Sequence, residues 1–253
     1  MEKRANIGRV LFFFLLIFLT APFVLSAQEN VTTLGVQIKP MITSKYFGTG
    51  TENVDEGELK VNFQPNLGWN FGMIIRRGIT KNWSFESGIC MAQRNFTMTF
   101  DHPDLLEKKQ MKFRYICYEI PLQGLIFVKL TDELYMNASA GFSLDLYPSN
   151  IETSTYEYLD TNRFDFYQKT FRNGWIQASI LANYGFEYRT TSKGYFYFGA
   201  SYHRPFSHIG TTAILFEKNT DPLRLQVLLG GNYLTADFRY FFHEKPERKK
   251  PKG

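Results

Sequence analysis

The sequence predicts an all-β protein, an eight-stranded antiparallel up-and-down transmembrane β-barrel that follows a cleaved signal peptide. Three observations support this prediction: an apolar leader at the N-terminus, eight segments with one apolar and one polar face, and connections that alternate between short and long. Outer-membrane barrels have short periplasmic turns and long extracellular loops. We therefore expect the chain to lie in the cell outer membrane.

Residues 1–27 have the organisation of a secretory signal peptide. Lys3 and Arg4 precede the apolar run Val10–Leu19, and Leu25–Ala27 provides small residues for cleavage near Ala27. An uncleaved anchor is the alternative, but the run is shorter than the ~20 residues that a spanning helix needs. No later segment is comparably apolar. A membrane-embedded mature chain must then be a closed barrel, which pairs all of its backbone groups in lipid.

Composition agrees with this organisation. Aromatic residues make up 17% of the 253 residues, and charged residues make up 21%. The formal net charge of +5 comes from the leader and from the basic tail at 243–253, which we expect to be a disordered periplasmic segment. The predicted barrel at 28–242 is then neutral. The pI near 9.0 is therefore no sign of nucleic-acid binding.

Eight segments alternate with a period of two, which is typical of strands with one buried face. The first four, where the alternation is less regular, lie at 36–42, 66–75, 85–91 and 118–129. The last four lie at 136–145, 176–189, 195–203 and 233–242. Ser87 interrupts the apolar face of the third segment, whereas 176–189 alternates without a break.

The connections set the orientation of these segments. Three are short, at Arg77–Asn82, Leu130–Glu133 and Thr190–Gly194. Four are long, at Ser44–Gln64, about Phe100–Gln110, Pro148–Gly174 and about Ser207–Leu223. The alternation places both mature termini on the periplasmic side. Several segments exceed the ~9–11 residues needed to span, so we expect the wall to continue beyond the outer leaflet.

Charged residues lie on the face opposite the aromatic residues. We expect them to form a charge network inside the barrel, because buried charges need partners. The predicted network consists of Lys39, Glu86, Glu119, Asp145, Glu187, Arg189, Asp237 and Arg239. A soluble barrel of the lipocalin kind is the alternative, with the two faces exchanged. Eight strands enclose a lumen that side chains fill, which argues against a general porin.

The two cysteines lie on the inner faces of the third and fourth segments. A hairpin centred between His102 and Pro103 would place Cys90 opposite Cys117. Directly opposed residues are within disulfide range, and the periplasm is oxidising. Two free thiols that fill the lumen are the alternative, because a bulge would change the register.

Sequence spacing indicates no metal site, cofactor or catalytic centre. The histidines His102, His203, His208 and His243 have no metal-ligand spacing. Ser201 and His203 share an inner face, which leaves open a lipid-modifying hydrolase or acyltransferase. That chemistry requires a convergent geometry that spacing does not show, so the sequence favours a protein without enzymatic activity.

The longest connection is rich in aromatic and charged residues. Its rings are Tyr156, Tyr158, Phe164, Phe166 and Tyr167. Such a mixture is typical of protein contact surfaces. A loop that packs its own rings over the barrel mouth is the alternative.

Most of the mature chain resembles the Bacteroidetes outer-membrane β-barrel family typified by PorT. The resemblance is carried by Asn70–Arg77 with Trp83–Gly88, by Tyr118–Leu122, and by Ala140–Phe142 with Leu146-Tyr147. It implies an outer-membrane location, with membrane lipid around the barrel. It also implies a role in protein export through a type IX-like system, with secretion-machinery proteins as partners. It brings no catalytic residue, and no nucleic acid or small-molecule substrate is evident.

Overall fold

The structure is a computed structural model that describes residues 31–42, 52–80, 82–159, 162–219 and 221–243. The predicted signal peptide at 1–27, and the tail from residue 244 onward, lie outside the described residues. No described residue belongs to a helix that is long and apolar enough to cross a membrane.

The described residues form thirteen antiparallel strands rather than the predicted eight. Their bounds are β1 Thr32–Ile42, β2 Glu52–Glu56, β3 Leu59–Gly78, β4 Trp83–Asp101, β5 Lys109–Lys129, β6 Leu134–Leu146, β7 Ile151–Leu159, β8 Asn162–Arg172, β9 Ile176–Arg189, β10 Tyr195–Pro205, β11 Gly210–Lys218, β12 Asp221–Leu229 and β13 Tyr233–Phe241. All eight predicted segments lie within strands of the structure, with slightly different ends. The five additional strands are β2, β7, β8, β11 and β12.

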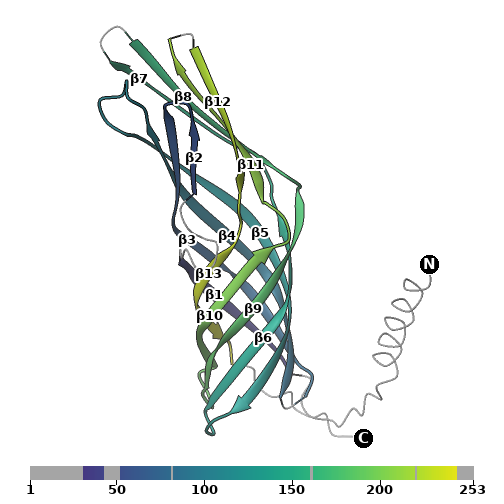
Figure 1. The fold of residues 1–253 in the computed structure, drawn as a ribbon. Coiled ribbons are helices and arrows are strands. Elements are labelled where there is room, and N and C mark those ends of the chain that lie inside the picture. The colour runs from purple at the N-terminus through teal and green to yellow at the C-terminus, as the bar shows by residue number, and fades with distance from the viewer. Residues whose placement is uncertain (1–30, 43–51, 81, 160–161, 220, 244–253) are drawn as a thin grey trace, which may run out of the picture.

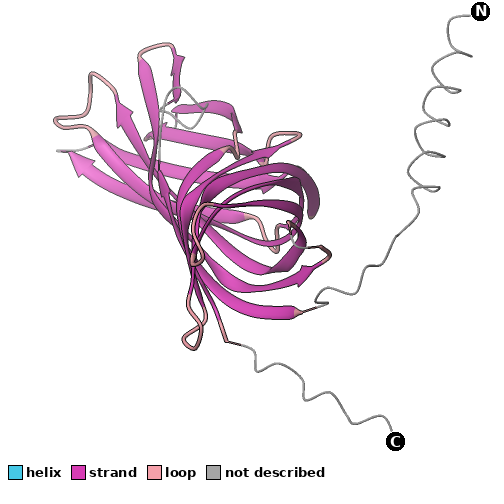
Figure 2. Cartoon of the chain, turned by 90° about the horizontal axis from the view of Figure 1, so that it is seen from below, coloured by secondary structure: helices cyan, strands magenta, loops and turns pink. Residues whose placement is uncertain are grey.

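Eight of the strands, which we call the ring strands, are hydrogen-bonded to two neighbours each. The order is β1-β13-β10-β9-β6-β5-β4-β3, and β3 also pairs with β1 from Thr32↔Arg77 to Met41↔Gly68. A path of paired neighbours therefore leads from β1 back to β1. Figure 2 shows these strands curving around a common axis.

The additional strands lie at one end of the ring strands, at the top of Figure 1. Strand β2 forms a hairpin with the first residues of β3, and β12-β11-β8-β7 form a separate four-stranded sheet. The prediction of long loops at Pro148–Gly174 and Ser207–Leu223 is therefore wrong. They consist mainly of two hairpins, β7–β8 and β11–β12.

The opposite end, which we call the lower end, carries the three predicted short turns (Figure 1). Each turn uses a threonine in the same way. The hydroxyls of Thr80, Thr131 and Thr190 accept the backbone N–H three residues later, at distances of 3.0, 3.0 and 2.8 Å. A side chain that satisfies a turn N–H favours a tight reversal. Sequence thus determines the short connections locally.

In the lower part of the ring strands, the outward side chains are apolar and exposed. On β5, Tyr118, Leu122 and Ile126 all point outward. Equivalent exposed residues on the other ring strands include Leu34, Val36, Phe71, Met73, Phe85, Ile89, Phe142, Ile180, Phe186, Phe198 and Phe238. A continuous apolar exterior of this extent suits lipid rather than water. The inward positions at the same level are mostly polar and buried.

In the upper part of β3, β4 and β5 the two faces exchange polarity. On β5, Lys112 and Arg114 point outward and are exposed, while Met111 and Phe113 point inward and are buried. On β3, the exchange coincides with a register shift between Asn66 and Trp69. Each strand keeps its period of two, but its outward face changes from apolar to polar. Such a change indicates that the outward side chains meet lipid in the lower part and water in the upper part.

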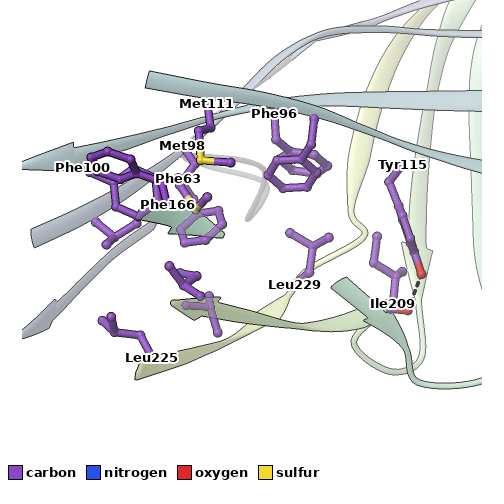
Figure 3. Close-up of a cluster of buried hydrophobic side chains, with 14 of the residues drawn as sticks. Phe63, Phe96, Met98, Phe100, Met111, Tyr115, Phe166, Ile209, Leu225 and Leu229 are labelled. Carbon is purple, nitrogen blue, oxygen red and sulfur yellow. Dashed lines mark hydrogen bonds between the residues drawn. The ribbon is translucent and has the colours of Figure 1, made fainter. Parts of the chain in front are cut away.

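The inward apolar residues of the upper part form the main hydrophobic core of the described chain. Side chains of β3, β4 and β5 pack against those of the four-stranded sheet, as Figure 3 shows. The rings of Phe100 and Phe166 lie 5.0 Å apart, and Phe166 and Phe216 lie 5.4 Å apart. We call this two-sheet unit the cap: β2, the upper parts of β3, β4 and β5, and strands β7, β8, β11 and β12.

Candidate functional site

The structure places all eight residues of the predicted charge network on the inner face of the ring strands. They lie on β1, β4, β5, β6, β9 and β13. Arg189 is partly exposed, and the others are buried. The alternation of the strands accounts for this placement, because residues two apart point to the same side.

Near the lower end, the charges form a continuous group, the lower ion cluster. It comprises Lys39, Arg76, Glu86, Glu187, Arg189, Asp237 and Arg239. Arg239 lies at the centre, with Nη1 2.5 Å from Oε1 of Glu86 and Nη2 2.8 Å from Oδ2 of Asp237. Arg76 bridges Glu86, at 3.0 Å, and Glu187. Every carboxylate of this cluster has a cationic partner.

Sequence reasoning missed two members of the inner network, Arg76 and Arg94. Both are buried, at 5% exposure each. Arg76 lies one residue beyond the end assigned to its segment, and Arg94 lies three residues beyond, each on the inner face. Continuing the alternation by one more inward position on β3, and by two on β4, would have found them.

Higher inside the ring strands, a second group forms the upper polar cluster of Asn70, Arg94, Glu119, Asp145, His203 and Tyr233. Glu119 on β5 stands directly opposite Asp145 on β6. His203 on β10 lies with Nε2 3.1 Å from Oδ2 of Asp145 and 3.8 Å from Oε1 of Glu119. Its ring stacks on Tyr233 with 4.5 Å between centroids. Glu119, Asp145 and His203 come from three different strands, so spacing within one strand could not show that they converge.

The residues proposed for a hydrolase are not arranged as a nucleophile and its base. The hydroxyl of Ser201 donates to Oδ2 of Asp237 at 2.5 Å and accepts from Nδ2 of Asn183 at 2.8 Å. A small cavity of about 20 Å³ adjoins Ser201 and His203. Such a space holds about one water molecule, which leaves no room for an acyl chain.

The two cysteines are not opposite one another, so that prediction is wrong. Cys90 pairs across the sheet with Glu119, and Cys117 with Ala92, a register two residues away from the expected one. Diagonal neighbours of this kind are about 7–8 Å apart, too far for a disulfide. Both thiols are free and buried. Cys90 Sγ accepts from Gln37 and Cys117 Sγ from Arg94.

The predicted partner loop is a hairpin of the cap, and its rings divide between the two faces. Phe164 and Phe166 are buried in the core, so they are unavailable to a partner. Tyr156 and Tyr158 are exposed, at 61% and 62%. Tyr167 is partly exposed and lines a surface groove of about 540 Å³ together with Tyr156 and others.

Several ion pairs lie on the surface of the cap. Arg163, the second residue of β8, lies over the Tyr156 ring at 5.4 Å and pairs with Asp165 at 2.7 Å. Near the tip, Lys218 donates to Oδ2 of Asp104 at 2.6 Å, which lowers the pKa of that carboxyl. Exposed pairs of this kind contribute little stability each.

Comparison with solved structures finds the outer-membrane protein OprG from Pseudomonas aeruginosa. The TM-score is 0.47 and the identity is 10%, with 84% of this chain and 96% of that chain covered. Comparison with curated proteins gives no match.

A family described as "Outer membrane protein beta-barrel domain" matches residues 29–210, more than half of the chain. The match includes the ring strands from β1 to β10, and β13 pairs with both β1 and β10. The apolar exterior and the polar, charge-paired interior described above are what such a domain needs in lipid. The chain belongs to this outer-membrane β-barrel family.

Proposed function

We propose that the eight ring strands form a closed transmembrane barrel that anchors the folded cap outside the cell. In this proposal the protein has no enzymatic activity and acts through the cap, and through its periplasmic face, as a membrane scaffold or accessory in protein export. The observation that carries the proposal is the exchange of polarity along β5. Lipid-facing residues give way there to water-facing residues while the strand continues into a second folded unit.

The orientation follows from the connections. Short turns are characteristic of the periplasmic side, so the lower end with its three threonine turns faces the periplasm. Both mature termini then lie on that side, after cleavage near Ala27. Strand β5 contains 21 residues, about twice the ~9–11 that cross a membrane. The excess length supports a cap that stands clear of the outer leaflet.

The cap surface suits contact with a protein partner. Tyrosine and arginine are enriched in such surfaces, and Tyr156 and Tyr158 of β7 form such a group with Arg163 of β8. The resemblance to the PorT-typified family supports export as the process. A lipid-modifying enzyme gains no support from the contacts of Ser201 and His203.

Purified folded protein is expected to give no stable conductance in planar bilayers. The inside of an eight-stranded barrel is filled by side chains, and here the lower ion cluster crosses it. A trimeric general porin, measured in the same membrane, is the positive control. Reproducible open-channel currents that scale with the amount of folded protein would contradict the prediction.

Deletion of the gene tests the cellular role. We expect secreted proteins to decrease in the culture medium while the acyl chains of the outer-membrane lipid stay unchanged. Complementation with Tyr156→Ala/Tyr158→Ala should restore a folded, membrane-inserted protein but not full export. A matched control, Arg204→Ala on the outer face of β10, should restore both, because Arg204 lies outside the cap and the periplasmic turns. Altered acyl chains with normal export would instead support the enzyme.

A further inference from the structure

We propose that the upper polar cluster binds one divalent transition-metal ion, of which Zn²⁺ fits best. Glu119, Asp145 and His203 each offer one ligand atom, and these three atoms lie within 4.8 Å of one another. Nε2 of His203 lies close to Oδ2 of Asp145 and Oε1 of Glu119, which we take as the carboxylate ligands. All three residues are buried, at 4%, 0% and 1% exposure. The ion would connect β5, β6 and β10 across the inside of the barrel.

The first reason is the placement of the two carboxylates. Glu119 and Asp145 are directly opposed on neighbouring strands, and like charges in that position destabilise a sheet. Arg94, with Nη2 3.5 Å from Oε1 of Glu119, is the one guanidinium that the described residues place beside them. With a neutral His203 the group therefore keeps one uncompensated negative charge in a low-dielectric interior, which a bound cation would offset.

The second reason is the state of His203. Both of its ring nitrogens are buried, and neither makes a hydrogen bond of acceptable direction among the described residues. Nε2 nevertheless lies 3.1 Å from Oδ2 of Asp145. No well-directed hydrogen bond therefore occupies Nε2, which remains available as a ligand beside the two carboxylates.

The distances suit a small ion with nitrogen and oxygen ligands. Zn²⁺ binds such atoms at about 2.0–2.1 Å in a tetrahedron, so two ligands lie about 3.3 Å apart. Nε2 of His203 is 3.1 Å from Oδ2 of Asp145 and 3.8 Å from Oε1 of Glu119. Small side-chain adjustments would complete the geometry. Ca²⁺ and Mg²⁺ prefer sets of oxygen ligands alone, which makes them less suitable here.

Outer contacts already orient the two carboxylates for this role. Oε2 of Glu119 accepts from Tyr233 and from Asn70, both at 2.7 Å. Oε1 lies toward His203 and, among the described residues, accepts only a long hydrogen bond from Sγ of Cys117, at 3.4 Å. Asp145 accepts from Ser143 at 2.6 Å and from Ser179. Such second contacts fix ligands and tune the affinity of metal sites. The adjoining cavity, which Glu119 and His203 help to line, has room for about one water molecule as a fourth ligand.

The test uses the full mature chain, folded in detergent and incubated with Zn²⁺ before extensive dialysis. Elemental analysis should give about one Zn²⁺ per chain, because a site with three buried ligands retains its ion. His203→Gln should reduce the occupancy to below about a tenth of that value. The matched control is His208→Gln, since His208 is exposed and outside the cluster. That variant should keep the full occupancy.

A second measurement needs no variant, in case His203→Gln does not fold. Co²⁺ added to the folded wild type should produce the intense visible bands of a tetrahedral nitrogen–oxygen site, and Zn²⁺ should remove them. The proposal is overturned if the wild type retains no stoichiometric Zn²⁺ and shows no such bands. It is equally overturned if a folded His203→Gln variant retains the ion.

Discussion

Replacing Arg239 with methionine is expected to lower the free energy of unfolding of the barrel by about 3–5 kcal/mol. Arg239 is 3% exposed and pairs with both Glu86 and Asp237. Its guanidinium also lies 4.7 Å from the Tyr197 ring centroid. Methionine fills much of the same volume, but it leaves two carboxylates with one partner each in a buried site. Breaking such a network by removing one member is more harmful than replacing it whole.

Urea titration of the protein folded in lipid vesicles measures this loss. Arg204→Met is the matched control, because Arg204 is exposed on the outer face of β10; we expect it to change stability by less than about 1 kcal/mol. The double variant Arg239→Met/Glu86→Gln should recover part of the loss, since Arg76 keeps Glu187 and Lys39 keeps Asp237. Equal stability of Arg239→Met and the wild type would show that the cluster is not a structural element.

Replacing Phe166 with alanine is expected to unfold the cap while the barrel stays intact. Phe166 is fully buried between Phe100 and Phe216. Removal of a buried phenylalanine costs about 3–5 kcal/mol. The cap has its own hydrophobic core, separate from the lower ion cluster, so the loss should be confined to it.

Limited proteolysis of the folded protein in detergent measures this local unfolding of the cap. Cleavage within 150–230 should become at least about a hundredfold faster, because cleavage follows the population of the open form. The barrel should keep its compact migration in unboiled gel samples. Tyr158→Ala, which removes an exposed ring of the same hairpin, should leave the rate close to that of the wild type. Loss of the compact form in Phe166→Ala would mean that cap and barrel fold as one unit.

The sequence predicted the ring strands well because lipid imposes a strict pattern on them. Apolar and polar residues alternate wherever one face meets hydrocarbon, and 176–189 is the clearest example. The same pattern identified the inner charge network in the lower part. The pattern did not identify Arg76 and Arg94, because the ends of strands are only weakly marked in a sequence.

The sequence did not predict the cap, because its segments lack the lipid-facing pattern of barrel strands and were therefore assigned as loops. Phe164 and Phe166 alternate with Asp165, which is a strand pattern whose apolar face turns inward instead of outward. Only the opposing residues from β3, β4 and β5 reveal a shared core, and these are distant in sequence. Glu119 and Asp145 were predicted as inner charges, but the assembly of the upper polar cluster around His203 was missed for the same reason. Its members meet through pairing, and the register of β4 against β5 differs by two residues from the one that the cysteines suggested.

Spin labels on the outward face of β5 can show whether this single strand passes from lipid to water. Labels would be attached to cysteines introduced at Lys112, Arg114, Leu122 and Ile126 in vesicle-embedded protein; the native thiols are buried. We expect positions 112 and 114 to collide mainly with a water-soluble nickel complex, and positions 122 and 126 mainly with oxygen dissolved in the bilayer. Equal access of the nickel complex to all four positions would contradict the account.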